Sequence, residues 1–300
     1  RREHQDDLQS TIERTRELLG KALGEQLYAD VPVCSLLSGG LDSTILTAMA
    51  QRKLQAEQGG TVNSFSVDFV GQAEQFQADA FRPERDEPYA LAAAAHIGSQ
   101  HQTILIDNRE LVADQARQAV YLANDSAATF GDVDTSLYLL FKAIRGHSTV
   151  AISGEAADEV FGGYAWCRDP QAIAAARMPW LSRMQLLQAE LINPDFNRHC
   201  DFAGYQDSAY HQALDQVQHL PGDDAVERRM REISHLHLHH WLPILLDRKD
   251  RLSMAASLEV RVPYTDHELV EYVHNVPWSI KGRGGEEKWL LKQATADLLP

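Results

Sequence analysis

The segment Ser38-Gly39-Gly40-Leu41-Asp42-Ser43 places two glycines, two serines and a carboxylate between an apolar run and a helix-like stretch. Glycines let backbone N–H groups approach an anion, and the start of a helix adds potential that favours negative charge. The segment therefore predicts a phosphate-binding loop, although the lysine of the Walker pattern is absent. Asp42 would repel phosphates without a divalent cation between them, which predicts Mg²⁺ with a nucleotide. The alternative is a ligand-free Gly-Gly turn with Asp42 as helix N-cap.

A second segment, Ser153-Gly154-Glu155-Ala156-Ala157-Asp158-Glu159, also follows a predicted strand. If Glu155 begins a helix, Asp158 and Glu159 fall at i+3 and i+4, so the three carboxylates share one face. Such a cluster repels itself unless a metal or an ammonium group supplies positive charge. The alternative is a solvated first turn whose acidic residues interact with the helix dipole. The two segments together favour a functional site.

Other residues that could do chemistry give weaker signals. Four histidines, His235, His237, His239 and His240, lack an HExxH pattern and a carboxylate to complete a metal site, so we expect them to pack or to lie on a polar helix face. The three cysteines have no CxxC spacing, which predicts neither a disulfide framework nor a zinc site and indicates the reducing cytosol.

The elements that must position the two segments alternate between strands and helices. The predicted strands are 31–37, 62–69, 102–106 and 149–153, and the predicted helices are 6–27, 42–54, 87–97, 111–122 and 135–144. This order predicts an α/β fold with a doubly wound parallel sheet, in which ligands bind at the carboxyl ends of the strands.

Beyond about residue 166 the strand signals fade, and we expect a helical C-terminal lobe interrupted at prolines that include Pro170, Pro194 and Pro243. Residues 71–85 and 281–285 read as loops, the first of them mobile. The expected division is an N-terminal helix at 1–30, an α/β core at 31–165 and a helical lobe at 166–300.

Charge and hydropathy limit the partners. The chain has 300 residues, with 28 Lys and Arg against 43 Asp and Glu, a formal net charge of −15. Such a field repels phosphate backbones, and there is no dense basic run, so nucleic acid is excluded as a partner. No apolar stretch approaches the roughly 18 residues of a membrane span. We therefore expect a folded cytoplasmic protein that does not bind membranes.

Four segments in order resemble the synthetase domain of the glutamine-dependent asparagine synthetases. They are SGGLDS at 38–43, SGEAADEVFGGY at 153–164, LLDRKDRLSMAASLEVRVP at 245–263 and EKWLL at 287–291. The resemblance implies the ATP-pyrophosphatase (adenine nucleotide alpha hydrolase-like) fold. It also implies an AMP-forming amide synthetase: a carboxylate, by default aspartate, attacks the α-phosphate of ATP, pyrophosphate leaves, and ammonia or an amine attacks the acyl-adenylate.

The resemblance also assigns roles residue by residue. The pyrophosphate is held by Ser38, Gly39, Gly40, Asp42 and Ser43. The adenosine is lined by Leu37, Val67, Ser153 and Gly154. Mg²⁺ is bound by Asp42 and Asp158. The catalytic groups are Glu155, which positions or deprotonates the nucleophile, Glu159, which assists it, and Lys288, which stabilises developing charge. Further candidates for phosphate or substrate contact are Arg251 and Arg261. Without its motif, Lys288 would read as a solvated helix residue.

Departures from the family pattern leave alternatives open. Ala156-Ala157 replace the usual Gly-Ser, which would reshape the acceptor pocket. No glutaminase half precedes Arg1 in the sequence, so we expect ammonia to come from solution or from a glutaminase domain or subunit as partner. An amide ligase or cyclase of natural-product biosynthesis remains an alternative. A non-catalytic nucleotide-binding module is a third, which the set Glu155, Asp158 and Lys288 disfavours.

Overall fold

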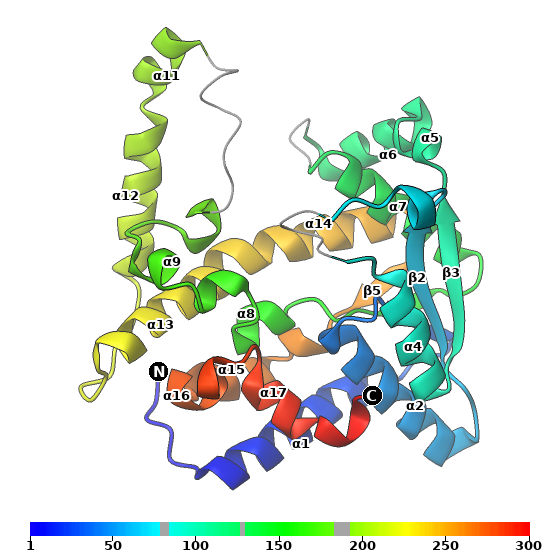
Figure 1. The fold of residues 1–300 in the computed structure, drawn as a ribbon, viewed down its shortest axis with the longest axis horizontal. Coiled ribbons are helices and arrows are strands. Elements are labelled where there is room, and N and C mark those ends of the chain that lie inside the picture. The colour runs from blue at the N-terminus through cyan, green and yellow to red at the C-terminus, as the bar shows by residue number, and fades with distance from the viewer. Residues whose placement is uncertain (79–83, 127–129, 183–192) are drawn as a thin grey trace. The chain divides into compact units, whose positions relative to one another are not determined.

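The computed structural model describes residues 1–78, 84–126, 130–182 and 193–300. They form two compact units, each built from several chain segments (Figure 1). The first unit comprises 1–13, 157–243 and 270–293, and the second comprises 14–156, 244–269 and 294–300. This differs from the expected division, because residues 244–269 and 294–300 pack with the α/β core rather than with the helices that flank them in sequence.

The second unit contains a five-stranded parallel sheet in the order β3-β2-β1-β4-β5. Its strands are β1 (Val33–Leu36), β2 (Asn63–Phe69), β3 (Gln100–Ile106), β4 (Val150–Ile152) and β5 (Glu259–Arg261). The strand order reverses direction between β1 and β4, which is where ligands bind in open α/β sheets. The first four strands confirm the predicted fold class, whereas β5 contradicts the expectation that the chain beyond residue 166 is helical.

Helices cover both faces of this sheet, as a doubly wound fold requires. The helices of the unit are α2 (Leu41–Gln58), α3 (Gln72–Gln75), α4 (Glu87–Ile97), α5 (Asn108–Leu111), α6 (Asp114–Asn124) and α7 (Asp132–Arg145), with nearly all of α14 (Leu242–Ala255). On one face Cys34 packs with α6, α7 and α14 through residues such as Phe141 and Leu252. On the other, Leu37 packs against α4, and Ser35 hydrogen-bonds Thr47 of α2 at 2.7 Å. The helix α1 (Leu8–Gln26) begins in the first unit and ends in the second.

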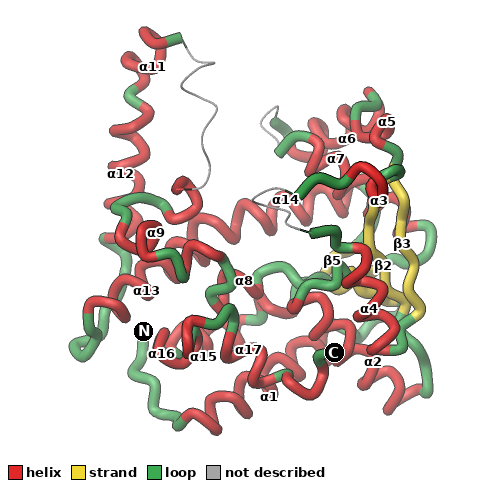
Figure 2. The backbone as a smooth tube through the Cα atoms, viewed as in Figure 1, coloured by secondary structure: helices red, strands yellow, loops and turns green. Residues whose placement is uncertain are grey.

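The described part of the first unit contains helices but no strand (Figure 2). Its α-helices are α8 (Ala157–Phe161), α9 (Pro170–Ala174), α11 (Pro194–Cys200), α12 (Phe202–Leu214), α13 (Ala225–Leu236) and α16 (Trp278–Lys281), with most of α15 (His267–Asn275) and α17 (Trp289–Ala294). Short 3₁₀ turns lie at 165–167, 179–182 and 283–285, and others at 263–265 and 296–298 belong to the second unit. One core cluster contains Met178, Trp180 and Leu236.

Two of the prolines expected to interrupt helices begin them instead. Pro170 and Pro194 are the first residues of α9 and α11, where the missing N–H costs nothing. Pro243 was expected to interrupt a helix, but it lies in the first turn of α14, directly after the π-helical turn His237–Trp241. The wider π turn changes the hydrogen-bond register just before the residue that has no N–H to donate.

Two expected loops contain short helices. Within 71–85 the structure has α3, and residues 79–83 lie outside the described chain. Residues 281–285 include the end of α16 and a 3₁₀ turn. Among the described residues, no helix is both long and apolar enough to span a membrane.

Candidate functional site

The two chemistry-bearing segments leave neighbouring parallel strands at the point where the strand order reverses. Residues 38–43 follow β1, and residues 153–156 follow β4. Their backbones are in contact: a Cβ added at Gly154 would lie 2.9 Å from the Ser43 nitrogen and 3.1 Å from the Asp42 Cβ. The sheet therefore brings together Ser38 to Ser43 with Ser153 and Gly154, as the sequence predicts.

The loop after β1 has a conformation that requires glycine. Gly39 has φ +84°, and a Cβ there would lie 2.3 Å from the Ala90 backbone nitrogen. Within the loop, the Ser43 hydroxyl oxygen lies 3.1 Å from the Ser38 hydroxyl oxygen and donates to the Gly40 carbonyl oxygen at 3.1 Å. Ser38 and Gly40 are exposed. The result is an open loop with hydroxyl and backbone N–H groups at the start of a helix, which suits a phosphate anion.

Asp42 does not cap the helix, contrary to the ligand-free alternative. Gly40 is the N-cap of α2, and Asp42 lies half-buried in its first turn. The buried Tyr264 hydroxyl donates to the Asp42 backbone oxygen at 3.3 Å. This hydrogen bond fixes the first turn of α2. Fixing the Asp42 backbone in this way keeps the Asp42 carboxylate beside the loop.

The two predicted adenosine-lining side chains outside the loops pack on different faces of the sheet. Leu37 is fully buried against Ala93 and Ala94, and its N–H donates to the Phe65 carbonyl oxygen at 2.8 Å. Val67 is half-buried against the cluster on the opposite face. Their joint contact with adenosine remains a prediction.

Glu155 is bound by a lysine that was not among the site residues predicted from the sequence. Lys249, on α14, lies 2.7 Å from Glu155 Oε2 and donates to Ser153 Oγ at 2.8 Å. The Glu155 backbone N–H donates to the same Ser153 Oγ at 3.3 Å. Lys249 stands within the segment 245–263 that carries the family resemblance, but only the fold shows that it reaches Glu155.

In the first unit, Asp158 and Lys288 form an ion pair. Lys288 Nζ lies 2.8 Å from Asp158 Oδ1, and the lysine side chain is 3% exposed. Lys288 has φ +48°, a left-handed conformation that is uncommon for a residue other than glycine. Its burial excludes the solvated-helix alternative. Gly163 lies against the pair, since a Cβ there would be 1.8 Å from Asp158 Oδ1 and 2.0 Å from Lys288 Cε.

Glu159 is buried, which excludes a solvated first turn for this carboxylate. It is 2% exposed and accepts a hydrogen bond from the Tyr164 hydroxyl, which itself accepts one from Trp241 Nε1 at 2.8 Å. Burial and the Glu159 charge raise the pKa of Tyr164 far above its usual value, so Tyr164 stays a donor. Glu159 therefore lies in a rigid network beside Asp158.

Two arginines predicted as phosphate or substrate contacts are bound elsewhere. Arg251 is exposed, pairs with Asp247 at 2.8 Å and donates to the Ala123 carbonyl oxygen. Arg261 pairs with Glu259 and donates to the carbonyl oxygens of Gln26 and Tyr28 at 2.6 and 2.8 Å. These contacts give Arg261 a structural role at the end of β5.

The predicted Mg²⁺ ligands belong to different units. Asp42 lies in the second unit and Asp158 in the first. No group of three His, Cys, Asp or Glu suited to a metal occurs among the described residues. Mg²⁺ bound with a nucleotide needs only one or two carboxylates, since phosphates and water supply its other oxygens. Both residues offer that donor type, and their pairing remains a prediction.

Two of the four histidines, His235 and His237, are buried in the first unit. His237 is fully buried, accepts a hydrogen bond from Trp166 Nε1 at 2.8 Å and lies edge-on to Tyr164. Burial lowers the pKa of His237 to about 3. His235 is also buried, with its ring centroid 4.3 Å from that of His239. Packing thus accounts for His235 and His237.

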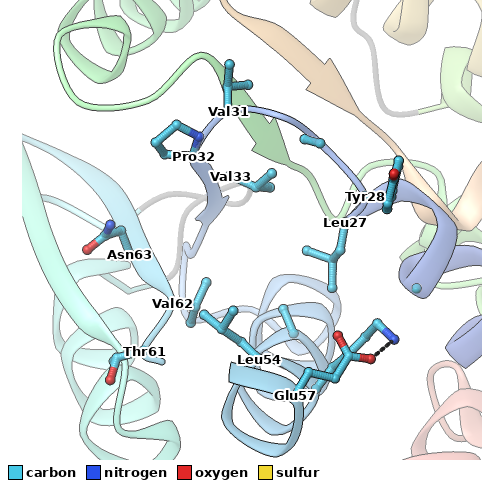
Figure 3. A pocket seen from close by; sticks show the side chains of 14 residues that line it. Leu27, Tyr28, Val31, Pro32, Val33, Leu54, Glu57, Thr61, Val62 and Asn63 are labelled. Atoms are coloured by element: carbon cyan, nitrogen blue, oxygen red, sulfur yellow. Dashed lines mark hydrogen bonds and ion pairs between the residues drawn. The ribbon is translucent and has the colours of Figure 1, made fainter. Parts of the chain in front are cut away.

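A cavity of about 570 Å³ lies at the opposite edge of the sheet, where β1 and β2 begin (Figure 3). Apolar side chains such as Leu27, Val33, Leu54 and Val62 line it together with polar residues that include Thr61 and Asn63. The two charged residues that line it, Lys53 and Glu57, pair with each other at 2.5 Å. None of its lining residues belongs to the two chemistry-bearing segments.

Comparison with known proteins gives one consistent result. The model of the asparagine synthase family matches residues 14–300. Asparagine synthetase (glutamine-hydrolyzing) 3 of Bacillus subtilis is 37% identical over 297 residues, covering 99% of this chain and 47% of that protein. Asparagine synthetase (glutamine-hydrolyzing) 1 of the same organism is 27% identical, covering 96% and 47%. The chain thus spans about half the length of these curated relatives. A solved NAD⁺ synthetase from Burkholderia pseudomallei overlaps at 15% identity with a TM-score of 0.30, covering 90% of each chain, which is too weak to support an argument.

Proposed function

Because the chain belongs to the asparagine synthase family, we propose that it is an ATP-dependent amide synthetase. It activates a substrate carboxylate as an acyl-adenylate, releases pyrophosphate, and transfers ammonia or an amine to the acyl group. The observation that supports this most is the contact between the loop after β1 and the segment after β4, at the reversal point of the sheet. A phosphate loop and a glutamate that serves the nucleophile are needed side by side in such a reaction.

Different residues of the proposed site act in the two steps of the reaction. In the first, a substrate carboxylate oxygen attacks the α-phosphorus of ATP and pyrophosphate leaves, held by backbone N–H groups and hydroxyls of Ser38 to Ser43. In the second, nitrogen attacks the acyl carbon, the bond to AMP breaks, and Glu155 accepts the proton that nitrogen loses. The buried ammonium of Lys288 stabilises charge that develops in both steps.

Asp42 and Asp158 are the carboxylates that would hold Mg²⁺. When bound, the ion neutralises phosphate charge and removes the repulsion that Asp42 would otherwise exert. ATP and Mg²⁺ are therefore the proposed cosubstrate and cofactor.

The proposed substrates are aspartate and ammonia. The curated relatives are named as glutamine-hydrolyzing asparagine synthetases, and this chain matches about half of their length. A glutaminase domain or subunit is therefore the proposed source of ammonia, and free ammonium replaces it in vitro. The proposed location is the cytoplasm.

The test is ATP-dependent pyrophosphate release, with mass detection of AMP and amide, using aspartate, ammonium and Mg²⁺ and omitting each component in turn. Asparagine formed in step with AMP supports the proposal in full. Pyrophosphate release with another carboxylate or amine would indicate an amide ligase or cyclase of natural-product biosynthesis. ATP binding without pyrophosphate release across a carboxylate screen would overturn the proposal in favour of a binding module.

Variants connect this activity to the two segments. Replacing Asp42 or Glu155 by alanine should lower amide formation at least about 100-fold. The matched controls, Asp114→Ala and Glu57→Ala, change exposed carboxylates outside the loops and should keep near wild-type turnover. Near-normal turnover in either Asp42→Ala or Glu155→Ala would remove the assigned site.

A further inference from the structure

Lys249, on α14, reaches the segment after β4 with a charged group. We propose that Lys249 is a positioning residue for the amine-transfer step, holding Glu155 through Oε2 so that Oε1 accepts the proton from the attacking nitrogen. This inference rests on the proposed function and names a residue within its site.

The contacts form a closed triangle. Lys249 Nζ binds Glu155 Oε2 at 2.7 Å and Ser153 Oγ at 2.8 Å, and Ser153 Oγ also accepts the Glu155 backbone N–H at 3.3 Å. Ser153 is 3% exposed, and the side chains of Lys249 and Glu155 are 11% and 23% exposed. A glutamate held at both its backbone and its carboxylate loses most of its rotational freedom.

The neighbouring residue on α14 shows that packing alone does not explain Lys249. Arg248 forms an ion pair with Asp134, which is 1% exposed, and donates to the Val133 carbonyl oxygen at 3.2 Å. Leu252, one turn further on, is fully buried in the core. These contacts fix α14 against α7, so Lys249 is not required to anchor the helix.

The chemistry of the second step gives Lys249 its role. The carbon–nitrogen bond forms, the acyl–oxygen bond breaks, AMP leaves with the bonding electrons, and nitrogen loses a proton. A base contributes to this step only when its oxygen is within hydrogen-bond reach of that proton. Adenylation precedes the arrival of nitrogen and needs no base at this position, so the two steps should respond differently to a change at Lys249.

The experiment measures both steps in the same variants of the whole chain. Carboxylate-dependent exchange of labelled pyrophosphate into ATP reports adenylation, and single-turnover amide formation with ammonium reports transfer. The carboxylate is aspartate, or another that supports exchange in the wild type. Lys249→Gln should keep exchange within about threefold and lose about 100-fold in transfer, the scale of a general base. The loss should lie in the limiting single-turnover rate constant rather than in the ammonium concentration that gives half of it. Lys249→Arg, which retains the charge, should recover part of transfer.

Arg248→Met is the matched control for a purely structural effect. Loss of its pair with Asp134 should lower thermal stability and change exchange and transfer by similar factors. If Lys249→Gln behaves in the same way, reduces exchange more than transfer, or leaves both unchanged, the inference is overturned. Absence of exchange in the wild type with every carboxylate overturns the proposed function and the inference together.

A double variant covers the case in which Lys249→Gln does not fold. Glu155→Gln with Lys249→Gln removes both charges, so no buried charge is left unpaired. Exchange should then stay within about threefold of Glu155→Gln alone, and transfer should fall no further than in that single variant, because both changes act on one function. An additional loss in either step would contradict the inference.

Discussion

Two buried lysines, one in each unit, pair with carboxylates of the same short segment. Lys249 binds Glu155 in the second unit, and Lys288 binds Asp158 in the first. Lys249 lies within the regular helix α14, whereas Lys288 precedes α17 in a left-handed conformation. Lys249 is therefore positioned by the helix that carries it. Lys288 is positioned by a left-handed backbone conformation, which is strained for a residue other than glycine.

The boundary between the units falls between Ala156 and Ala157, in the middle of this segment. Glu155 and Asp158 are therefore each paired with a lysine of their own unit rather than with one shared cation. The repulsion between Glu155 and Asp158 that the sequence predicts is thus reduced by a different lysine on each side of the boundary. Changes on the two sides should then have separable effects.

The largest effect is expected from Lys288→Met. The lysine is 3% exposed, so its charge acts in a poorly solvated environment where preorganised charge is most effective. Pyrophosphate exchange and amide formation should both fall about 100-fold to 1,000-fold. Lys292→Met, one turn along on α17, is the control and should retain activity. A loss confined to amide transfer would make Lys288 equivalent to Lys249 and remove the distinction between them.

A smaller loss is expected from Gly163→Ala. The added Cβ would fall 1.8 Å from Asp158 Oδ1 and 2.0 Å from Lys288 Cε, so both side chains must move although the backbone need not. Turnover should fall about tenfold or more, with little change in melting temperature. Gly222→Ala, where an added Cβ meets nothing within 4 Å, is the control. Unchanged turnover in Gly163→Ala would show that the Asp158–Lys288 geometry is not required.

The sequence predicts the sheet well where strands are apolar runs and poorly where they are not. Helix α4 has the predicted bounds, and β2 differs by one residue. Strand β5 was missed because it has three residues, of which Glu259 and Arg261 are charged, and it lies at the edge of the sheet, where β4 is its neighbour among the described strands. An edge strand of this kind carries no period that separates it from a loop.

The motifs of the candidate site could be predicted from the sequence, but the ion pairs between their side chains could not. The contact between Gly154 and Ser43 follows from two strands ending at one edge, which the α/β order implies. The contact between Lys249 and Glu155 joins residues 94 positions apart, and it depends on how α14 packs. Likewise, Lys288 is assigned through its motif, but its burial comes from the fold.

A third buried lysine, Lys281, makes a contribution to stability that depends on pH. Burial, with the guanidinium groups of Arg1 and Arg231, lowers its pKa from 10.5 to about 7, although Glu227 opposes this. Between pH 7 and 10.5 the unfolded chain binds more protons at this group, so its contribution to stability rises with pH. Below pH 7 the lysine is charged in both states, and the full cost of burial is present.

Lys281→Met should therefore unfold at a higher temperature than the wild type below pH 7. This advantage should shrink as the pH rises towards 10.5, the ordinary value. Thermal unfolding of the variant and the wild type across this range measures the difference. An advantage that is constant with pH would mean that Lys281 titrates near its ordinary value.

The smallest effects concern the two alanines at the unit boundary, and they should differ from each other. Ala156 has φ +76°, which costs an L-residue about 1–2 kcal/mol and a glycine almost nothing. Ala156→Gly relieves this strain, but it loses a buried methyl group and adds chain entropy to the unfolded state. These two changes lower the free energy of unfolding by about 0.8 and about 0.5–1 kcal/mol, respectively. Its free energy of unfolding should stay within about 1 kcal/mol of the wild type.

Ala157 begins α8 and is fully buried, so Ala157→Gly has the same two losses without any relief of strain. It should be about 1–2 kcal/mol less stable than Ala156→Gly in denaturant unfolding. Since both residues are buried alanines, burial cannot explain such a difference, and backbone conformation is the remaining variable. Equal losses would mean that the left-handed turn at Ala156 stores no strain, and that the acidic segment crosses the boundary in a relaxed conformation.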